Sequence, residues 1–203
     1  MKKKLVYGVG VNDAEYPIDL RDVWYECGKK KQKVLWICPF YRKWTSMLER
    51  CYSEKCQQKY PTYKGCSVCQ EWLTFSNFKA WMERQDWKDK HLDKDILFPG
   101  NKVYSPDTCV FVEQRVNKFL NEHNAARGEY MIGVDWYKPS KKFRASCTNG
   151  SGKNKHLGYF TSEVDAHKAW LDYKLKLAYQ LASEQTDARI AKALIERYEN
   201  YEA

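Results

Sequence analysis

The 203-residue chain has no stretch that approaches the roughly 18 consecutive apolar residues of a membrane span. Its first residues, 1–8, also lack the apolar run of a secretory signal. Without an export signal, eight irregularly spaced cysteines indicate thiols or metal ligands rather than a disulfide framework. The sequence contains no internal repeat and no low-complexity tract. We therefore expect a soluble cytoplasmic protein without disulfides, with one large domain or two small ones.

Acidic residues are in the minority, because 26 Asp and Glu stand against 35 Lys and Arg, for a formal net charge of +9. The excess is uneven: it is +5 over residues 1–50, +1 over 51–122, +5 over 127–182 and −2 over 183–203. Basic segments that carry Trp and Tyr suit nucleic acid, because Lys and Arg release condensed counterions and aromatic rings stack or wedge. The charge alone is equally compatible with an ordinary lysine-rich surface.

Hydrophobic spacing in the first 122 residues predicts helices and short strands. Residues 1–36 contain a few short strands at most, with a basic turn at 28–33. A helix is predicted over 40–54, and a second short helix follows with Ser76 as its N-cap. The remainder is predicted to be a strand, a loop, a strand and a helix, at 91–97, 98–108, 109–112 and 113–120.

The last third predicts a three-stranded antiparallel sheet packed on one long helix. The strands are expected at 131–137, 142–147 and 156–160, and the helix follows Thr161. A final amphipathic helix lies after Ser183. The predicted fold class is therefore α+β, and the predicted parts are a basic arm 1–36, a central unit 37–122, a linker 123–128, a sheet unit 129–182 and a C-terminal helix 183–203.

The cysteines of the central unit are candidates for a zinc site. Cys66 and Cys69 have the two-residue spacing of a metal knuckle, and Cys51, Cys56 or Cys109 could complete four ligands. The favoured set for Zn²⁺ is Cys51, Cys66, Cys69 and Cys109. However, the sequence has no second knuckle, and cysteine is among the most frequently buried residue types. Buried thiols are therefore the preferred interpretation, with structural zinc as the alternative.

The strand-loop-strand-helix order of residues 91–120 is the sharper signal. The residues that carry it are Trp44 to Cys51, Val68 to Trp72, Leu92 to Asp95, Tyr104 to Val112, and Asn117. With them the chain resembles the HNH endonucleases, specifically the compact phage-encoded homing type. The resemblance implies a ββα-metal unit that holds one divalent ion, Mg²⁺ or Mn²⁺, at the scissile phosphate of double-stranded DNA. An activated water would attack the phosphorus.

The resemblance also assigns roles to single residues. Asp93 corresponds to the family's metal-binding acid, and Asn117 corresponds to its metal-binding asparagine; both are hard oxygen ligands. Lys94 stands where the family has its general-base histidine, and Thr108 stands where it has the asparagine that orients that histidine. A lysine must lose its proton to act as a base, which requires burial or a neighbouring cation to lower its pKa.

His91 is the obvious substitute for the missing base. In an extended strand His91 shares a face with Asp93 and Asp95, whereas Lys94 points the other way. Asp95 is therefore also a candidate catalytic residue. The alternative interpretation is that His91 is a partly exposed residue at a strand edge, without a catalytic role.

Residues 127–182 carry a second resemblance. Gly133-Val134-x-Trp136, Phe143 to Ala145, and Leu157 to Thr161 followed by a helix with Ala166 and Ala169 are similar to the DNA-binding domain of plant Apetala and ethylene-response transcription factors. The resemblance implies a three-stranded sheet that lies in the DNA major groove and reads bases with its outer face. The candidate DNA contacts are Tyr137, Lys138, Lys141, Lys142, Arg144, Ser146, Thr148, Lys153, Asn154, Lys155 and His156.

Strand alternation divides that sheet into two faces. Phe143, Ala145 and Cys147 are predicted to lie under the helix, and Arg144 is predicted to point outward. Asp135 is acidic where a base-reading arginine is common in the family, which argues against strong sequence specificity. Trp136 and Trp170 are expected in the core.

The two resemblances together predict a monomeric, phage-encoded homing-type endonuclease that nicks or cuts double-stranded DNA in the cytoplasm of a bacterial host. Two other functions stay open. One is a DNA-binding repressor or anti-defence protein that has lost catalysis, because Lys94 and Thr108 depart from the family pattern. The other is an inhibitor that binds a host protein through the acidic C-terminal helix.

Overall fold

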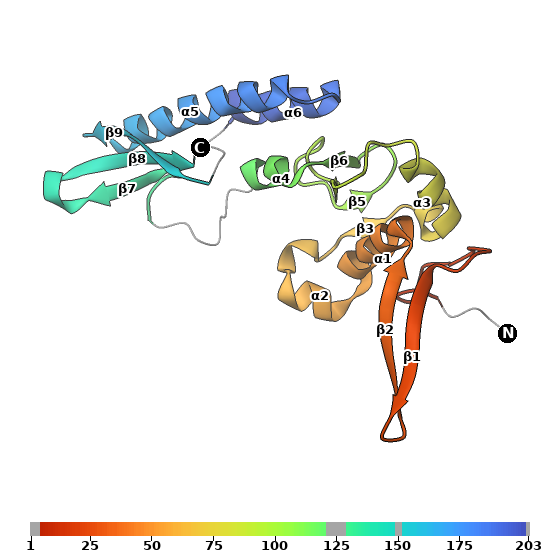
Figure 1. Ribbon diagram of the computed structural model, residues 1–203. Coiled ribbons are helices and arrows are strands. Elements are labelled where there is room, and N and C mark those ends of the chain that lie inside the picture. The colour runs from red at the N-terminus through yellow and green to blue at the C-terminus, as the bar shows by residue number, and fades with distance from the viewer. Residues whose placement is uncertain (1–4, 121–128, 149–151, 202–203) are drawn as a thin grey trace. The chain divides into compact units, whose positions relative to one another are not determined.

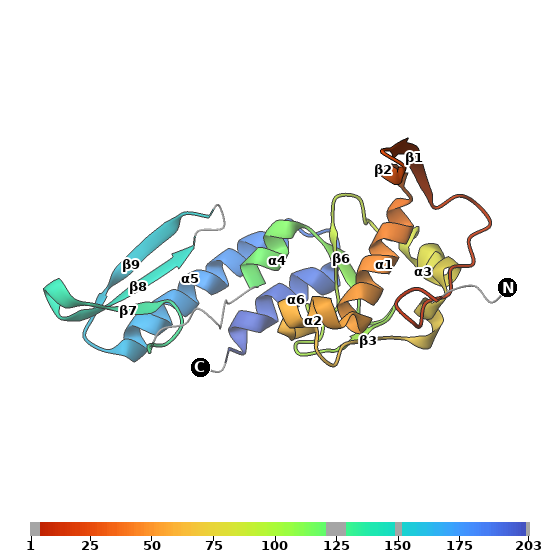
Figure 2. The ribbon, with the colours of Figure 1, turned by 90° about the horizontal axis from the view of Figure 1, so that it is seen from below.

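The computed structural model of the chain describes residues 5–120, 129–148 and 152–201, so the predicted linker lies outside the described residues. Backbone contacts divide the chain into two compact units, Met1–Phe111 and Val112–Ala203. Each unit combines helices with small sheets (Figures 1 and 2), which confirms the predicted α+β class. Among the described residues, no helix is long and apolar enough to span a bilayer.

The core of the first unit forms around helix α1 (Pro39–Tyr52), close to the predicted span 40–54. The side chains of Trp44 and Leu48 are fully buried, and the Trp44 indole N–H donates a 2.7 Å hydrogen bond to the Trp72 carbonyl. Helices α2 (Glu54–Lys59) and α3 (Phe75–Met82) follow, with the short 3₁₀ turns η1 (Pro61–Tyr63) and η2 (Gln70–Leu73). These elements enclose an aromatic core in one unit.

The N-cap of α3 is not Ser76, as predicted, but Thr74, which has an extended backbone. Ser76 lies inside the helix, and its N–H donates to the carboxylate of Asp13 at 3.0 Å. A distant side chain therefore satisfies one of the free N–H groups at this helix start, which the local sequence could not indicate.

Residues 1–36 were expected to hold only short strands, but the structure has a long hairpin there. Strand β1 (Asp19–Glu26) pairs antiparallel with β2 (Lys29–Ile37) and with no other described strand. Cys27 and Gly28 both have positive φ, 49° and 71°, as in the two-residue turns that match the twist of a hairpin. Every residue from 20 to 36 is exposed, so neither face shows the alternation that marks a half-buried strand.

Four short strands lie in the rest of the first unit and at its end. Strand β3 (Ser67–Val68) pairs in parallel with β5 (Val103–Tyr104), which falls within the predicted loop. Strand β4 (His91–Asp93) pairs with β6 (Val110–Val112), as the sequence suggested for this region. The predicted strand 91–97 is wrong beyond Asp93, because the Asp93 carboxylate accepts backbone N–H groups further along the chain and closes a turn.

The second unit contains the predicted three-stranded sheet. Strands β7 (Val134–Tyr137), β8 (Lys142–Thr148) and β9 (Asn154–Phe160) are antiparallel in the order β7-β8-β9, with the turn η4 (Lys138–Ser140). Helix α5 (Glu163–Ser183) covers one face, and helix α6 (Ala188–Glu199) packs on α5. Gly133 has φ +80°, and a Cβ there would lie 2.1 Å from the Trp170 ring, so only glycine fits under that indole.

Helix α4 (Gln114–Leu120) belongs to the second unit, whereas the sequence analysis placed the boundary at residue 122. The reason is the carbonyl of Phe119, which accepts hydrogen bonds from Lys174 at 2.8 Å and from the Tyr198 hydroxyl at 3.3 Å. Arg115 also forms an ion pair with Glu184 at 2.5 Å. These bonds tie α4 to α5 and α6.

Candidate functional site

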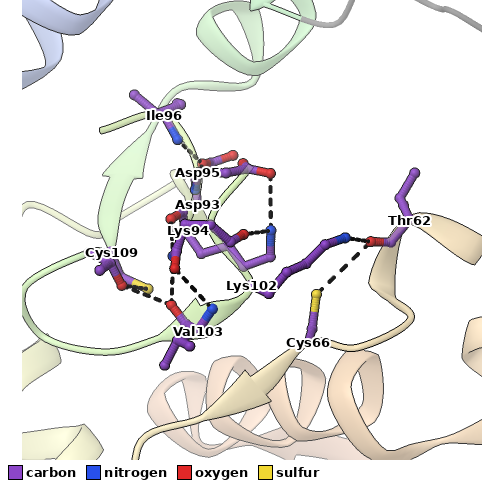
Figure 3. A network of polar contacts seen from close by, with 11 residues as sticks. Thr62, Cys66, Asp93, Lys94, Asp95, Ile96, Lys102, Val103 and Cys109 are labelled. Carbon is purple, nitrogen blue, oxygen red and sulfur yellow. Dashed lines mark hydrogen bonds and ion pairs between the residues drawn. The ribbon is translucent and has the colours of Figure 1, made fainter. Parts of the chain in front are cut away.

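The carboxylate of Asp93 ends strand β4 and organises the turn after it (Figure 3). Its Oδ1 accepts the backbone N–H groups of Asp95 and Ile96, both at 2.9 Å. Burial, and then the charge of Asp95, raise the pKa of Asp93 to about 6. The pKa of Asp95 is lowered instead, because hydrogen bonds from Asp93 and Lys94 outweigh its own burial. Two carboxyl groups with opposite pKa shifts therefore lie side by side.

Lys94, at the position of the family's general base, is buried and bonded to its neighbours. Its side chain is only 7% exposed, and its ammonium donates to Asp95 Oδ2 at 3.0 Å and to the Asn101 carbonyl at 2.8 Å. Asn101 returns a 2.6 Å hydrogen bond to the Lys94 carbonyl. Lys94 thus ties the turn to the following loop, which is a structural role and not the geometry of a proton acceptor.

Thr108 does not take the orienting role that the resemblance implies. Its hydroxyl donates to the Val103 carbonyl at 2.8 Å and shares a 2.9 Å hydrogen bond with the Ser105 hydroxyl. Val103 belongs to strand β5, and Ser105 to the loop that leads from β5 into β6. These bonds show Thr108 stabilising that loop.

Helix α1 brings two cations to β4 that the sequence analysis missed. Burial alone would lower the pKa of Arg50, but Tyr104 and, more weakly, Asp93 raise it overall. Lys43 donates a 2.5 Å hydrogen bond to the carbonyl of Lys90, the residue before His91. Lys43 and Arg50 are seven residues apart on one helix, so both lie on the same face. The seven-residue spacing in the sequence could have shown that Lys43 and Arg50 share a helix face, but it could not show that this face packs against β4.

The side chain of His91 is exposed and carries a neutral ring near pH 7. Burial of part of the ring, followed by the positive charges of Lys43 and Arg50, lowers the pKa of His91. A neutral imidazole can accept a proton, which a charged one cannot. His91, Asp93, Asp95, Lys43 and Arg50 therefore form one group, called here the β4 cluster, in which the two carboxyl groups act on each other and each cation acts electrostatically on a β4 residue.

The β4 cluster provides two carboxylates but no third protein ligand of the usual kind. Within residues 5–120, 129–148 and 152–201, no group of three or more His, Cys, Asp or Glu side chains could hold a metal ion. The predicted partner ligand Asn117 is half-buried on α4, which belongs to the second unit, whereas Asp93 belongs to the first. Mutual repulsion between Asp93 and Asp95 is nevertheless the electrostatic setting that a bound cation relieves.

The four candidate zinc cysteines lie in the core of the first unit as free thiols. Cys51, Cys66 and Cys109 are buried and Cys69 is half-buried. Burial raises the pKa of Cys51 and of Cys109 to about 12, with nearby thiols adding to the effect. Zinc binds cysteine as a thiolate, so a metal ion at these residues would have to displace protons that burial holds on the sulfurs.

The register of the second sheet shows which predicted DNA contacts share its outer face. Arg144 lies opposite Asp135 on β7 and opposite Tyr159 on β9, whereas Ala145 and Cys147 are buried under α5 as predicted. The outer positions that agree with the prediction are Tyr137, Lys142, Arg144, Ser146, Thr148, Asn154 and His156. Lys138 and Lys141 lie in and after the turn η4, and Lys153 precedes β9.

Two predictions for this sheet are wrong. Lys155 was expected to hold phosphate, but it lies opposite Cys147, and its ammonium sits 4.6 Å from the ring centre of Tyr173 on α5. It therefore packs on the helix side. Trp136 was expected in the core but is 38% exposed, because it lies on edge strand β7, whereas Trp170 is buried as predicted.

Arg144 is already bonded on the outer face. Its guanidinium donates two hydrogen bonds to the carboxylate of Asp135, at 3.1 and 2.9 Å, and lies over the Tyr137 ring. Tyr137 in turn contacts Tyr159, with ring centroids 5.1 Å apart. Asp135, the acidic residue that departs from the family pattern, therefore already accepts the hydrogen bonds that Arg144 would need for contacts with bases.

No protein-family model, curated protein or solved structure matches this chain. Its function must therefore be inferred from its own residues.

Proposed function

We propose that the chain is a metal-dependent endonuclease for double-stranded DNA, of the HNH homing type that its motifs resemble. The observation that carries the proposal is the β4 cluster, where a neutral histidine, paired carboxyl groups and two cations meet at one strand. Phosphodiester hydrolysis needs these three functions: a base for water, ligands for a cation and positive charge at the phosphate.

Each side chain of the cluster has a defined task in this proposal. His91 accepts a proton from the attacking water, because its lowered pKa leaves the ring neutral at pH 7. Lys43 and Arg50 hold the phosphate oxygens, and the guanidinium suits a bidentate contact. Asp93 and Asp95 would hold Mg²⁺ or Mn²⁺, which supplies charge stabilisation at the leaving oxygen when bound.

The second unit supports the choice of DNA as substrate. The outer face of its sheet presents polar and basic side chains that alternate with buried residues, a pattern suited to a groove. Because Arg144 is paired with Asp135, we expect this face to contribute affinity more than sequence specificity.

A nicking assay on supercoiled plasmid with Mg²⁺ or Mn²⁺, and with EDTA as the blank, tests the proposal. We expect Asp93→Asn to reduce cleavage by about 100-fold or more, because it removes the charge but keeps an oxygen acceptor for the turn. His91→Ala should cost about 100-fold. The matched control is Glu83→Gln, an exposed carboxylate at the end of α3.

Wild-type protein that leaves plasmid intact, or an Asp93→Asn variant that nicks as fast as wild type, would refute the endonuclease. Circular dichroism of each variant should match wild type, so that lost cleavage is not lost folding.

A second candidate function is supported by the geometry of Lys94. With the base position taken by a buried, ion-paired lysine, the unit could bind duplex DNA without cleaving it, as a repressor or anti-defence protein would. Salt-sensitive binding together with intact plasmid in the same assay would identify this case.

A further inference from the structure

We infer that the hairpin β1–β2 is a DNA-binding ribbon that enters the major groove of a duplex with one defined face. The hairpin is not needed for the core, because every residue from 20 to 36 is exposed. Figure 1 shows it projecting from the helices of its unit. The inference rests on the proposed function only in taking DNA as the partner.

The hairpin exposes more apolar surface than an isolated ribbon in water tolerates. Trp24, Tyr25, Leu35 and Trp36 are between 43% and 72% exposed. A two-stranded hairpin alone is marginally stable, and clustered exposed apolar side chains mark interaction surfaces. A partner that covers part of this surface would stabilise it.

Charge identifies the partner as a polyanion. The tip, residues 26–33, carries four lysines and a single acidic residue. Lysines at the end of a projecting arm can follow a phosphate backbone and release its counterions. A protein partner with an apolar surface would not account for this charge.

The two faces of the ribbon carry different side chains, and this difference indicates which face would contact the bases. Paired residues share a face, so one face carries Asp22, Trp24 and Glu26 opposite Lys33, Lys31 and Lys29. The other face, called here the Gln32 face, consists of Arg21, Val23, Tyr25, Lys30, Gln32 and Val34.

The Gln32 face has the chemistry of base recognition. Arg and Lys side chains bond to guanine edges, Gln bonds to adenine, and apolar side chains contact the thymine methyl group. The acid on the same side of β1 is Asp19 at the base of the hairpin, which is ion-paired with Arg21 at 2.5 Å. On the opposite face two carboxylates, Asp22 and Glu26, lie among the three lysines, and Glu26 is ion-paired with Lys31 at 3.8 Å, so most of the positive charge of that face is already neutralised.

The dimensions also fit. Two strands about 4.8 Å apart enter a major groove about 12 Å wide but not a minor groove about 6 Å wide. The eight residues of β1 extend about 27 Å at about 3.4 Å per residue, well beyond a groove depth of about 8.5 Å.

Adjacent lysines on opposite faces give a matched test. Lys30→Glu and Lys31→Glu change the net charge equally, but only Lys30 belongs to the Gln32 face. Binding to duplexes of about 30 base pairs with randomised sequence is measured in EDTA between about 50 and about 200 mM salt. We expect Lys30→Glu to weaken binding by about 10-fold or more and to reduce the salt slope by about one, against about threefold for Lys31→Glu.

A third variant replaces residues 20–36 with a short Gly-Ser turn, which the pairing of Asp19 with Ile37 at the hairpin base allows. We expect it to weaken duplex binding at least as much as Lys30→Glu. Equal effects of the two lysine variants, unchanged affinity after ribbon removal, or no duplex binding by wild type would overturn the inference. The inference would also be overturned if sedimentation showed that removing the ribbon only converts a dimer into a monomer. Because EDTA prevents cleavage, absence of nuclease activity does not affect this result.

Discussion

Each unit pairs a carboxylate with a cation at a position that the resemblances assign to function, but the surroundings of the two pairs differ. In the first unit the Lys94 side chain is 7% exposed beside Asp95, and in the second Arg144 and Asp135 are 40% and 45% exposed. Without the buried lysine, the Asn101 carbonyl would lose its donor and Asp95, whose side chain is 49% exposed, would lose its counterion, whereas the surface arginine can exchange Asp135 for another anion. The first pair therefore maintains structure, and the second can change partners without disturbing the fold.

The largest expected effect comes from breaking the buried pair. Lys94→Met should lower the free energy of unfolding of the first unit by about 2 to 3 kcal/mol, because the Asn101 carbonyl loses its buried donor and the half-exposed Asp95 loses its ion pair. Urea unfolding followed by tryptophan fluorescence measures the change. Lys102→Met, at an exposed lysine that bonds to the Thr62 carbonyl, is the control. A loss below about 1 kcal/mol for Lys94→Met would contradict the structural role.

The second largest effect is the pH dependence of the free energy of unfolding, to which Asp93 and Asp95 contribute in different pH ranges. A carboxyl whose pKa is raised on folding binds its proton more tightly in the folded state, so its stabilisation is present below pH 3.8 and is lost as pH rises through about 6. We expect the free energy of unfolding to fall by about 2 kcal/mol between about pH 4 and about pH 6.5. The lowered pKa of Asp95 acts only below this window.

Asp93→Asn removes the titrating group and should flatten that pH profile. A profile that stays equally steep in this variant would assign the dependence to another residue. For the proposed nuclease the sign is opposite, because the ionised carboxylate is the form that binds a cation, so cleavage should rise with pH through about 6.

The smallest effect is expected at the exposed pair. A double-mutant cycle of Asp135→Asn and Arg144→Gln should give a coupling energy below about 1 kcal/mol in thermal or urea unfolding. Duplex affinity should respond more clearly, because Asp135→Asn frees the guanidinium for phosphate or base edges and should strengthen binding several-fold. If the variant binds DNA more weakly than wild type, Asp135 itself contacts the duplex.

The sequence was sufficient for elements that bury one face. Helix α1 and helix α5 have apolar residues at helical spacing, and strands β7 to β9 alternate, so their positions were predicted to within a few residues. The hairpin β1–β2 escaped prediction because it buries neither face. The strand at 91–97 was overextended because a side chain, Asp93, ends it through hydrogen bonds that composition does not reveal.

The candidate site was predicted only where one segment supplies it. His91, Asp93 and Asp95 follow one another along β4 and the turn after it, so their grouping was readable. Lys43 and Arg50 come from a helix about 40 residues earlier, and only tertiary packing brings them to His91. The burial of Lys94 is likewise a property of the fold, since nothing in the local sequence distinguishes it from a surface lysine.

The turn of the hairpin has a practical consequence. Of the eight cysteines, all within the described part of the chain, Cys27 alone is exposed, whereas the others are buried or half-buried. A thiol-reactive fluorophore would therefore label the ribbon tip in preference to the core, and its signal on addition of a duplex would test whether that tip meets DNA. By the same chemistry, air oxidation would join two molecules tip to tip, so the purified protein should be kept under a reductant.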